Sequence, residues 1–165
     1  MKKIRCIVIP VDLDAAVDTL EFFEGDLSAM QGLVEGLVQA VDLEQQKATL
    51  WFNESGKIEH LPKNQRATME LWSSDSRWRF QDFVAGNAFI TGLSDEDGET
   101  TSVPQELVDL MLSTAKYRAE VTTLNDEDSW SSNNLEFPDY WEAAHSVLEL
   151  ASRWRMVSNC RVIAA

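Results

Sequence analysis

The stretch from residue 53 to residue 67 constrains the fold most, because it places a tight turn and a proline break close together. Its start, Asn53-Glu54-Ser55-Gly56, is typical of a turn, and the glycine supplies the positive φ that closes a short hairpin. We expect the returning strand at residues 57–60, and Pro62 ends it. Asn64 is placed to cap a following helical turn.

Short β-branched runs separated by turn signals predict a sheet in the first ninety or so residues. One helix lies within this region, with Asp26 as its N-cap and Gly36 as a left-handed terminator. Gly32 inside that helix lowers its stability by about 1 kcal/mol and is expected where another element approaches closely. The expected strands are residues 4–9, 17–23, 37–43, 48–52 and 83–90.

Composition changes at Ser94, beyond which two longer amphipathic helices are expected. Ser102 and Gln105 form a capping box for the first, whose apolar stripe continues to about residue 122. The second helix starts at Pro138, where a fixed φ suits the first turn. Its expected buried face consists of Trp141, His145, Leu148 and Ala151 or Ser152.

These patterns together predict an α+β fold. Its N-terminal part is a mixed β-sheet with one packed helix, and its C-terminal part contains the two longer helices. A polar segment at residues 125–134 separates those helices, and a last strand is expected at residues 160–163. We divide the chain into residues 1–93, the sheet core with the turn motif, and residues 94–165, an acidic and mainly helical part packed on that core. One compact domain overall is the expectation.

Cysteine and histidine are scarce, which limits the chemistry that the chain can perform. Cys6 and Cys160 lie at opposite ends and are expected as buried thiols, with a bridge between terminal strands as the alternative. With two histidines besides, we expect no metal site. The sequence contains neither a nucleophile elbow nor a glycine-rich phosphate loop, so we expect no catalytic residue and no cofactor. The apolar run that ends at Pro10 is too short for a secretory leader, and no run could span a membrane.

Charge is the strongest compositional signal. The net charge is −14, and residues 93–149 carry fourteen acidic residues against only Lys116 and Arg118. Such a field repels nucleic acid and favours encounter with basic surfaces, although solubility alone also explains acidic composition. We therefore expect no direct binding of nucleic acid. The candidates for an acidic interaction face are Asp95, Glu96, Asp97, Glu99, Glu106, Asp109, Asp126, Glu127, Asp128, Glu136, Asp139 and Glu142.

The central motif also resembles a known family. The residues that carry the resemblance are Asn53, Glu54, Gly56, Lys57, Leu61, Pro62, Asn64, Arg66, Ala67 and Thr68, followed by Val84, Ala85 and Gly86. They resemble the domain-of-unknown-function 3846 family of actinobacteria, actinophages and mobile elements, over residues of about 4–110. The resemblance implies a phage or mobile-element context in the cytoplasm of a bacterial host, and it implies no mechanism.

Two functions of different classes follow from these observations. The first is a small acidic accessory protein that binds a basic surface of a host protein, with imitation of DNA charge as one form. The second is a small-ligand or anion-binding domain or, less favoured, an enzyme. The ligand-binding or anion-binding function would use Asn53, Glu54, Gly56, Lys57, Pro62, Asn64 and Arg66. A homo-oligomer formed through strand edges is a further alternative, and no membrane partner is expected.

Overall fold

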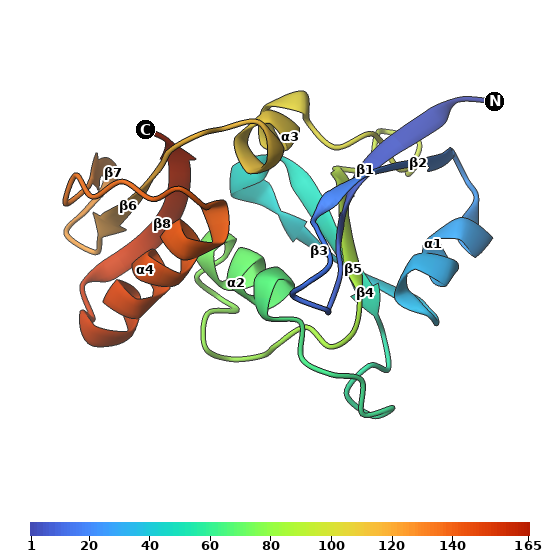
Figure 1. Ribbon diagram of the computed structural model, residues 1–165, viewed down its shortest axis with the longest axis horizontal. Coiled ribbons are helices and arrows are strands. Elements are labelled where there is room, and N and C mark those ends of the chain that lie inside the picture. Colours follow the sequence, from blue (N-terminus) through green and yellow to red (C-terminus); the bar gives the residue numbers. More distant parts are fainter. The chain divides into compact units, whose positions relative to one another are not determined.

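Eight strands and four α-helices follow one another along the chain (Figure 1), and the computed structural model describes all residues, 1–165. They divide into two compact units: unit 1 is residues 1–68 and 83–108, and unit 2 is residues 69–82 and 109–165. The elements are β1 (Lys3–Ile9), β2 (Asp18–Phe23), α1 (Leu27–Val34), β3 (Val38–Leu43), the 3-10 turn η1 (Glu44–Gln46), β4 (Ala48–Asn53), α2 (Gln65–Ser74), β5 (Ala88–Gly92), α3 (Gln105–Leu112), β6 (Tyr117–Thr123), β7 (Asp126–Ser131), α4 (Tyr140–Arg153) and β8 (Val157–Ala164).

The sheet of unit 1 has the strand order β2-β1-β5-β4-β3. The α+β class is therefore confirmed, but the sheet is not mixed, because every neighbouring pair is antiparallel. Short connections join β1 to β2 and β3 to β4, and connections of that length allow only antiparallel pairing. The central strand, β5, is buried along its whole length.

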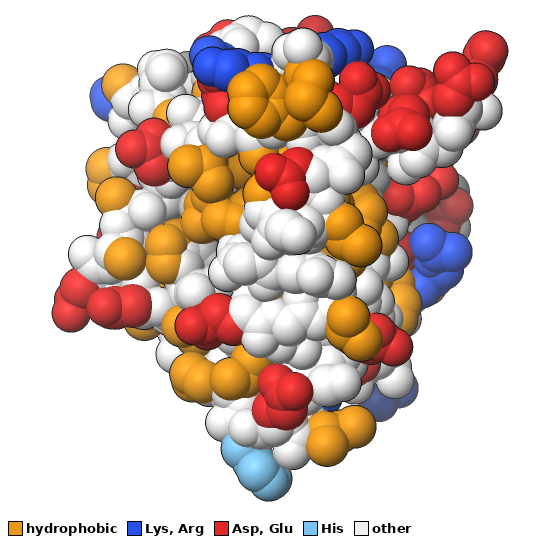
Figure 2. Space-filling model, turned by 90° about the vertical axis from the view of Figure 1, so that its right-hand side faces the viewer, with side chains coloured by type: hydrophobic (Ala, Val, Ile, Leu, Met, Phe, Trp, Pro, Cys, Tyr) orange, Lys and Arg blue, Asp and Glu red, His pale blue; other side chains and the backbone are white.

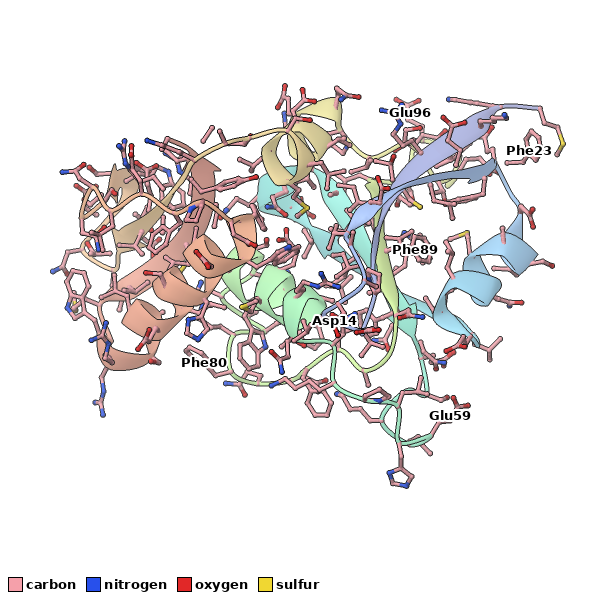
Figure 3. The ribbon with its side chains drawn as sticks, viewed as in Figure 1. Asp14, Phe23, Glu59, Phe80, Phe89 and Glu96 are labelled. Atoms are coloured by element: carbon pink, nitrogen blue, oxygen red, sulfur yellow. The ribbon has the colours of Figure 1, made fainter.

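Helix α1 covers one face of this sheet. Asp26 is its N-cap, as predicted, and its Oδ1 accepts a hydrogen bond from the Ala29 amide at 3.0 Å. Phe89 on β5 points toward α1 (Figure 3). Its ring packs against Phe22 at 6.2 Å and stacks on Trp51 at 5.9 Å between centroids. The buried cluster beneath the helix consists of Ile4, Cys6, Phe22, Met30, Val34 and Phe89.

The two glycines near the end of α1 have roles different from those predicted. The left-handed residue is Glu35, with φ 59°, rather than Gly36. A Cβ at Gly36 would lie 2.6 Å from Asn53 Nδ2, so this glycine is needed for close approach. Gly32 was expected at such an approach, but a Cβ there would meet nothing within 4 Å.

Alanine substitutions at these two glycines are expected to change stability in opposite directions. Gly36→Ala should lower the free energy of unfolding by about 1–2 kcal/mol, because the new methyl group displaces the buried Asn53 amide. Gly32→Ala should raise it by about 0.5–1 kcal/mol, because alanine favours helix and the site is open. Urea unfolding of both variants measures the difference, and equal effects would contradict it.

Unit 2 contains a second antiparallel sheet, with the order β7-β6-β8. The first helix of the C-terminal part was expected to reach about residue 122, but α3 ends at Leu112 and residues Tyr117–Thr123 form β6. β-branched residues at 121–123 suit a strand that pairs on both sides. The polar segment expected at residues 125–134 likewise contains β7, so this part is less helical than predicted.

The two residues of the capping box expected for α3 accept hydrogen bonds from β1. The Ser102 hydroxyl accepts a hydrogen bond from the Arg5 amide at 2.9 Å, and Gln105 Oε1 accepts one from Arg5 Nη1 at 3.1 Å. Both side chains therefore bind β1, which lies far away in the sequence.

Helix α4 packs on the sheet of unit 2 through a face that only partly matches the expected one, since Leu148 is buried and Ala151 packs against the same cluster. Its buried residues are Tyr140, Ala143, Ala144, Val147 and Leu148, whereas His145 is exposed. The prediction of a core histidine was wrong because the two alanines, which allow close approach, shift the buried stripe. None of the helices combines the length and the apolarity needed to cross a membrane.

Candidate functional site

Asn53, the first residue of the central motif, is used inside the fold. It is 4% exposed and ends β4. Its Nδ2 donates to the Val34 carbonyl at 3.1 Å, at the C-terminal end of α1, and its Oδ1 accepts from the Ser55 amide at 2.8 Å. The side chain thus caps a helix and shapes the turn, as residues of this type commonly do.

The segment after Asn53 is a compact coiled turn rather than a hairpin. The Glu59 amide donates to the Ser55 carbonyl at 2.9 Å, and the Leu61 amide donates to the Gly56 carbonyl at 2.8 Å. The strand expected at residues 57–60 is absent, and Gly56 has no positive φ. Glycine is required there for another reason: a Cβ would lie 2.9 Å from the Ala85 carbonyl oxygen.

Asn64 is fully buried and holds together three separate segments of unit 1. Its Nδ2 donates to the carbonyl oxygens of Ile9, at 2.9 Å, and Gly86, at 3.0 Å. Its Oδ1 accepts from the Ala67 amide at 2.9 Å, which confirms the predicted cap of the helix that follows Pro62.

Arg66, which is 8% exposed, holds the connection between β1 and β2. Its Nη2 donates to the carbonyl oxygens of Pro10 at 2.9 Å, Asp12 at 3.0 Å and Ala15 at 2.9 Å. Each of these acceptors belongs to the protein main chain. The guanidinium therefore stabilises the loop rather than pointing outward toward solvent.

The remaining cations of the motif are exposed and meet at one aromatic ring. Lys57 Nζ lies 5.0 Å and Lys63 Nζ 5.8 Å from the centroid of Phe83, in cation–π geometry. Glu54 is exposed as well, and Glu59 points away from the sheet of unit 1 (Figure 3). The predicted site thus separates into buried groups that bind the main chain and exposed groups that do not join them.

The acidic candidates of unit 1 lie on one loop and on the start of α3. Asp95 Oδ1 accepts from the amides of Asp97 and Glu99, at 2.9 Å each, so this carboxylate shapes the loop. Glu96 and Glu106, with the other candidates of this unit, are exposed. In Figure 2, acidic side chains on the visible face are interspersed with hydrophobic and basic ones over most of its area.

The acidic candidates of unit 2 fall into two groups. In the first, carboxylates have defined partners: Glu136 pairs with Lys116 at 3.6 Å and Arg118 at 3.7 Å, and Asp139 caps α4 through the Trp141 amide at 2.6 Å. The second group is exposed and forms no ion pair. It consists of Asp126, Glu127 and Asp128 on β7, and Glu142 on α4. The remaining candidate, Asp109, is exposed on α3.

β7 carries three of the carboxylates that form no ion pair. The strand lies at the edge of its sheet and hydrogen-bonds only to β6. Glu127 Oε1 accepts from the Ser158 hydroxyl at 2.6 Å, which directs this side chain over the sheet.

Sequence reasoning missed a pocket of about 260 Å³ in unit 2. Apolar lining comes from Ala119 and Val121 on β6 and from Val147 and Leu150 on α4. Polar lining comes from Ser131, Ser132, Asn133 and Ser146, and Arg153 and Trp154 complete it. Three segments far apart in the sequence form this pocket, so no local pattern could have indicated it.

A buried polar pair in unit 2 was missed as well. The Tyr140 hydroxyl donates to Glu70 Oε2 at 2.7 Å, and both residues are almost fully buried. Ser74 donates to the other oxygen of the same carboxylate at 3.3 Å. The signal available in the sequence was Glu70 itself, an acidic residue among the apolar residues of α2.

Both cysteines are buried free thiols, so the bridge that the sequence left open is not formed. Burial raises the pKa of the Cys6 thiol to about 12. Burial also raises the pKa of Cys160, although Arg79 opposes the effect. No group of three or more His, Cys, Asp or Glu side chains is placed to hold a metal ion.

We expect neither thiol of the native protein to react appreciably with a thiol reagent at pH 8. Both thiols should react after denaturation. The folded thiols remain protonated at pH values where unfolded ones ionise. The contribution of Cys6 to stability should therefore be complete below the ordinary pKa of 9.0 and be lost as the pH rises toward about 12, and the contribution of Cys160 should change in the same direction. A thiol titration of native and denatured protein tests the prediction. Rapid reaction of one native thiol would contradict it.

The fold and these side chains define a protein with two antiparallel sheets, whose central polar motif is built into one of them. The family model described as Domain of unknown function (DUF3846) matches residues 4–118, and the chain belongs to this family. The resemblance carried by the central motif is thereby confirmed. No curated protein and no solved structure matched the chain. The match ends at the start of β6, so β7 and α4 lie beyond it.

Proposed function

We propose that this chain is a small accessory protein of a phage or mobile element that binds a host protein with a basic surface. It would act in the cytoplasm of the bacterial host. Family membership supports this context through the distribution that the resemblance implies. The observation that carries the proposal is β7, an edge strand on which Asp126, Glu127 and Asp128 are all exposed.

The position of these carboxylates favours binding over solubility alone. Acidic residues that serve only solubility need no fixed arrangement, whereas Glu127 accepts a hydrogen bond from Ser158, and β7 pairs with β6 at Asp126 and Ser131 with a register shift between these two residues. Charges on an edge strand also prevent pairing with other chains, which explains why a partner would dock by charge rather than by extending the sheet. Complementary charge accelerates encounter and selects partners.

The central motif supports the alternative function less well. The Nδ2 atoms of Asn53 and Asn64 and the Nη2 of Arg66 donate to main-chain carbonyl oxygens of the protein itself. An anion site would need those groups to converge on a ligand. The exposed Lys57 and Lys63 gather at Phe83 without them.

Affinity capture with matched charge variants tests the proposal. The full chain is immobilised, exposed to a lysate of the bacterial host, and compared with an Asp126→Asn/Asp128→Asn variant. The control, Glu96→Gln/Asp97→Asn, removes the same charge from the loop of unit 1. The partner should bind the native chain and the control, and should be depleted about fivefold or more on the β7 variant.

Salt and DNA add two readouts to this capture. Raising the salt from about 0.1 M to 1 M should release the partner, because screening shortens the range of charge interactions. Duplex DNA should compete if the acidic surface imitates DNA charge. Equal capture by all variants, or capture that salt does not weaken, would refute docking by charge.

A further inference from the structure

We infer that the pocket of unit 2 receives one large apolar side chain from the segment that β7 attracts. The occupant is an extended basic segment of a partner protein, with an aromatic or large aliphatic anchor. This inference rests on the proposed function and adds to it the chemistry of the partner segment.

The size and lining of the pocket favour an apolar anchor. Its volume is about 260 Å³, and a cavity of about 150 Å³ already holds benzene. Val121 and Val147, two of its apolar lining residues, are almost fully buried. A charged group placed against them would lose favourable hydration, whereas removing a phenyl ring or a branched alkyl group from water is itself favourable.

The outer part of the pocket has the features of a protein-binding hot spot. Trp154 lines it and is 44% exposed. Exposed tryptophans beside a concave apolar site are enriched among residues that dominate binding energy, because they combine large area with few rotatable bonds. Ser131, Ser132 and Ser146 add hydroxyl groups that can bond the main chain of a docked segment.

The pocket is continuous with the acidic strand. Ser131, which lines the pocket, is the last residue of β7, and Asp128 precedes it by three residues. Three residues span at most about 10 Å, so Asp128 lies within that distance of Ser131. A partner segment in extended conformation therefore places a basic residue near Asp128 when that residue lies about three positions from the anchor.

The electrostatics of the pocket favour an uncharged anchor over a cationic one, because Arg153 in its lining is positively charged. Arg153 is the basic residue in its lining, and its Nε donates to the Glu149 carbonyl at 3.4 Å. This carbonyl belongs to the C-terminal turn of α4, where the helix dipole is negative. A neutral anchor with positively charged flanks fits such surroundings.

Two end-blocked peptides test the inference on the full chain. One has the sequence Lys-Ser-Ser-Phe-Ser-Ser-Lys, and the other replaces Phe by Ser at identical charge. The symmetric design places a lysine three residues from the anchor in either chain direction. Binding is followed at low salt by tryptophan fluorescence. The Phe peptide should bind about tenfold more tightly, the gain expected from burying one aromatic side chain.

Variants assign this preference to the pocket. Ser146→Leu fills the pocket from α4 and should reduce the preference to within about twofold, and Ser131→Leu fills it from β7 as a second test. Asp126→Asn/Asp128→Asn should weaken both peptides equally. Equal binding of the two peptides to the native chain would overturn the inference, as would a preference that survives both pocket variants.

The peptide test of the pocket can fail independently of the capture test of the proposed function. Loss of lysate capture on the β7 variant, together with no preference for the Phe peptide, would refute the pocket and leave charge docking in place. Capture unaffected by the β7 charges would refute the proposed function, and the inference with it.

Discussion

Replacing Asn64 by aspartate is expected to lower the free energy of unfolding of unit 1 by about 3 kcal/mol. The substitution keeps the acceptor for the Ala67 amide but removes the donor that binds the carbonyls of Ile9 and Gly86. A carboxylate would then face two carbonyl oxygens in a site with no exposure. Leaving a buried acceptor unsatisfied costs about 1–3 kcal/mol, and burying a charge adds to this cost.

The neighbouring Gln65→Glu substitution provides the control. It makes the same change from amide to acid, but at an exposed residue in the first turn of α2, where a negative charge is favourable. We expect its effect to stay within about 0.5 kcal/mol. Urea unfolding followed by circular dichroism measures both variants, and hydrogen exchange should locate the Asn64→Asp loss in β1 and β5. Similar stability of the two variants would show that the Asn64 donor contributes little.

The Tyr140→Phe substitution is expected to destabilise unit 2 by about 2 kcal/mol. It removes one hydroxyl group, which donates to the buried Glu70 carboxyl at 2.7 Å. Loss of this donor leaves Glu70 Oε2 without that bond in a site from which water is excluded. Ring packing against Tyr117 and Trp141 should persist, because the ring itself is unchanged.

Tyr117→Phe is the matched control for this prediction. Tyr117 is also buried, but its hydroxyl donates to the Met111 carbonyl at the longer distance of 3.3 Å. We expect a loss of about 0.5–1 kcal/mol, typical of a hydrogen bond between neutral groups. Thermal unfolding of the two variants compares them directly. A larger effect for Tyr117→Phe would mean that the Glu70 bond is not the stronger one.

Much of unit 1 could be predicted because its signals are local. The β-branched run of β1 and the Asp26 cap of α1 depend on residues within a few positions of one another. The turn between β3 and β4 is equally local. The same reasoning failed for β6, where an apolar spacing that suits a helix occurs in a strand. Pairing with β8, about forty residues later, overrides local preference there.

The candidate site shows the same division. Sequence reasoning singled out Asn53, Asn64 and Arg66, and it predicted the helix cap formed by Asn64. It could not identify the acceptors of Arg66, because these carbonyls lie more than fifty residues earlier. The pocket of unit 2 and the Tyr140–Glu70 bond likewise join segments that no local pattern connects.

The amino-acid sequence by itself determined the α+β class, the family, the acidic surface and most elements of the first ninety residues. These properties follow from composition and from interactions between near neighbours. Tertiary structure alone decided which polar residues are buried, which carboxylates lie unpaired on β7, and where the pocket forms. The physical reason is that burial and pairing depend on contacts between distant segments, and those contacts exist only after the chain has folded.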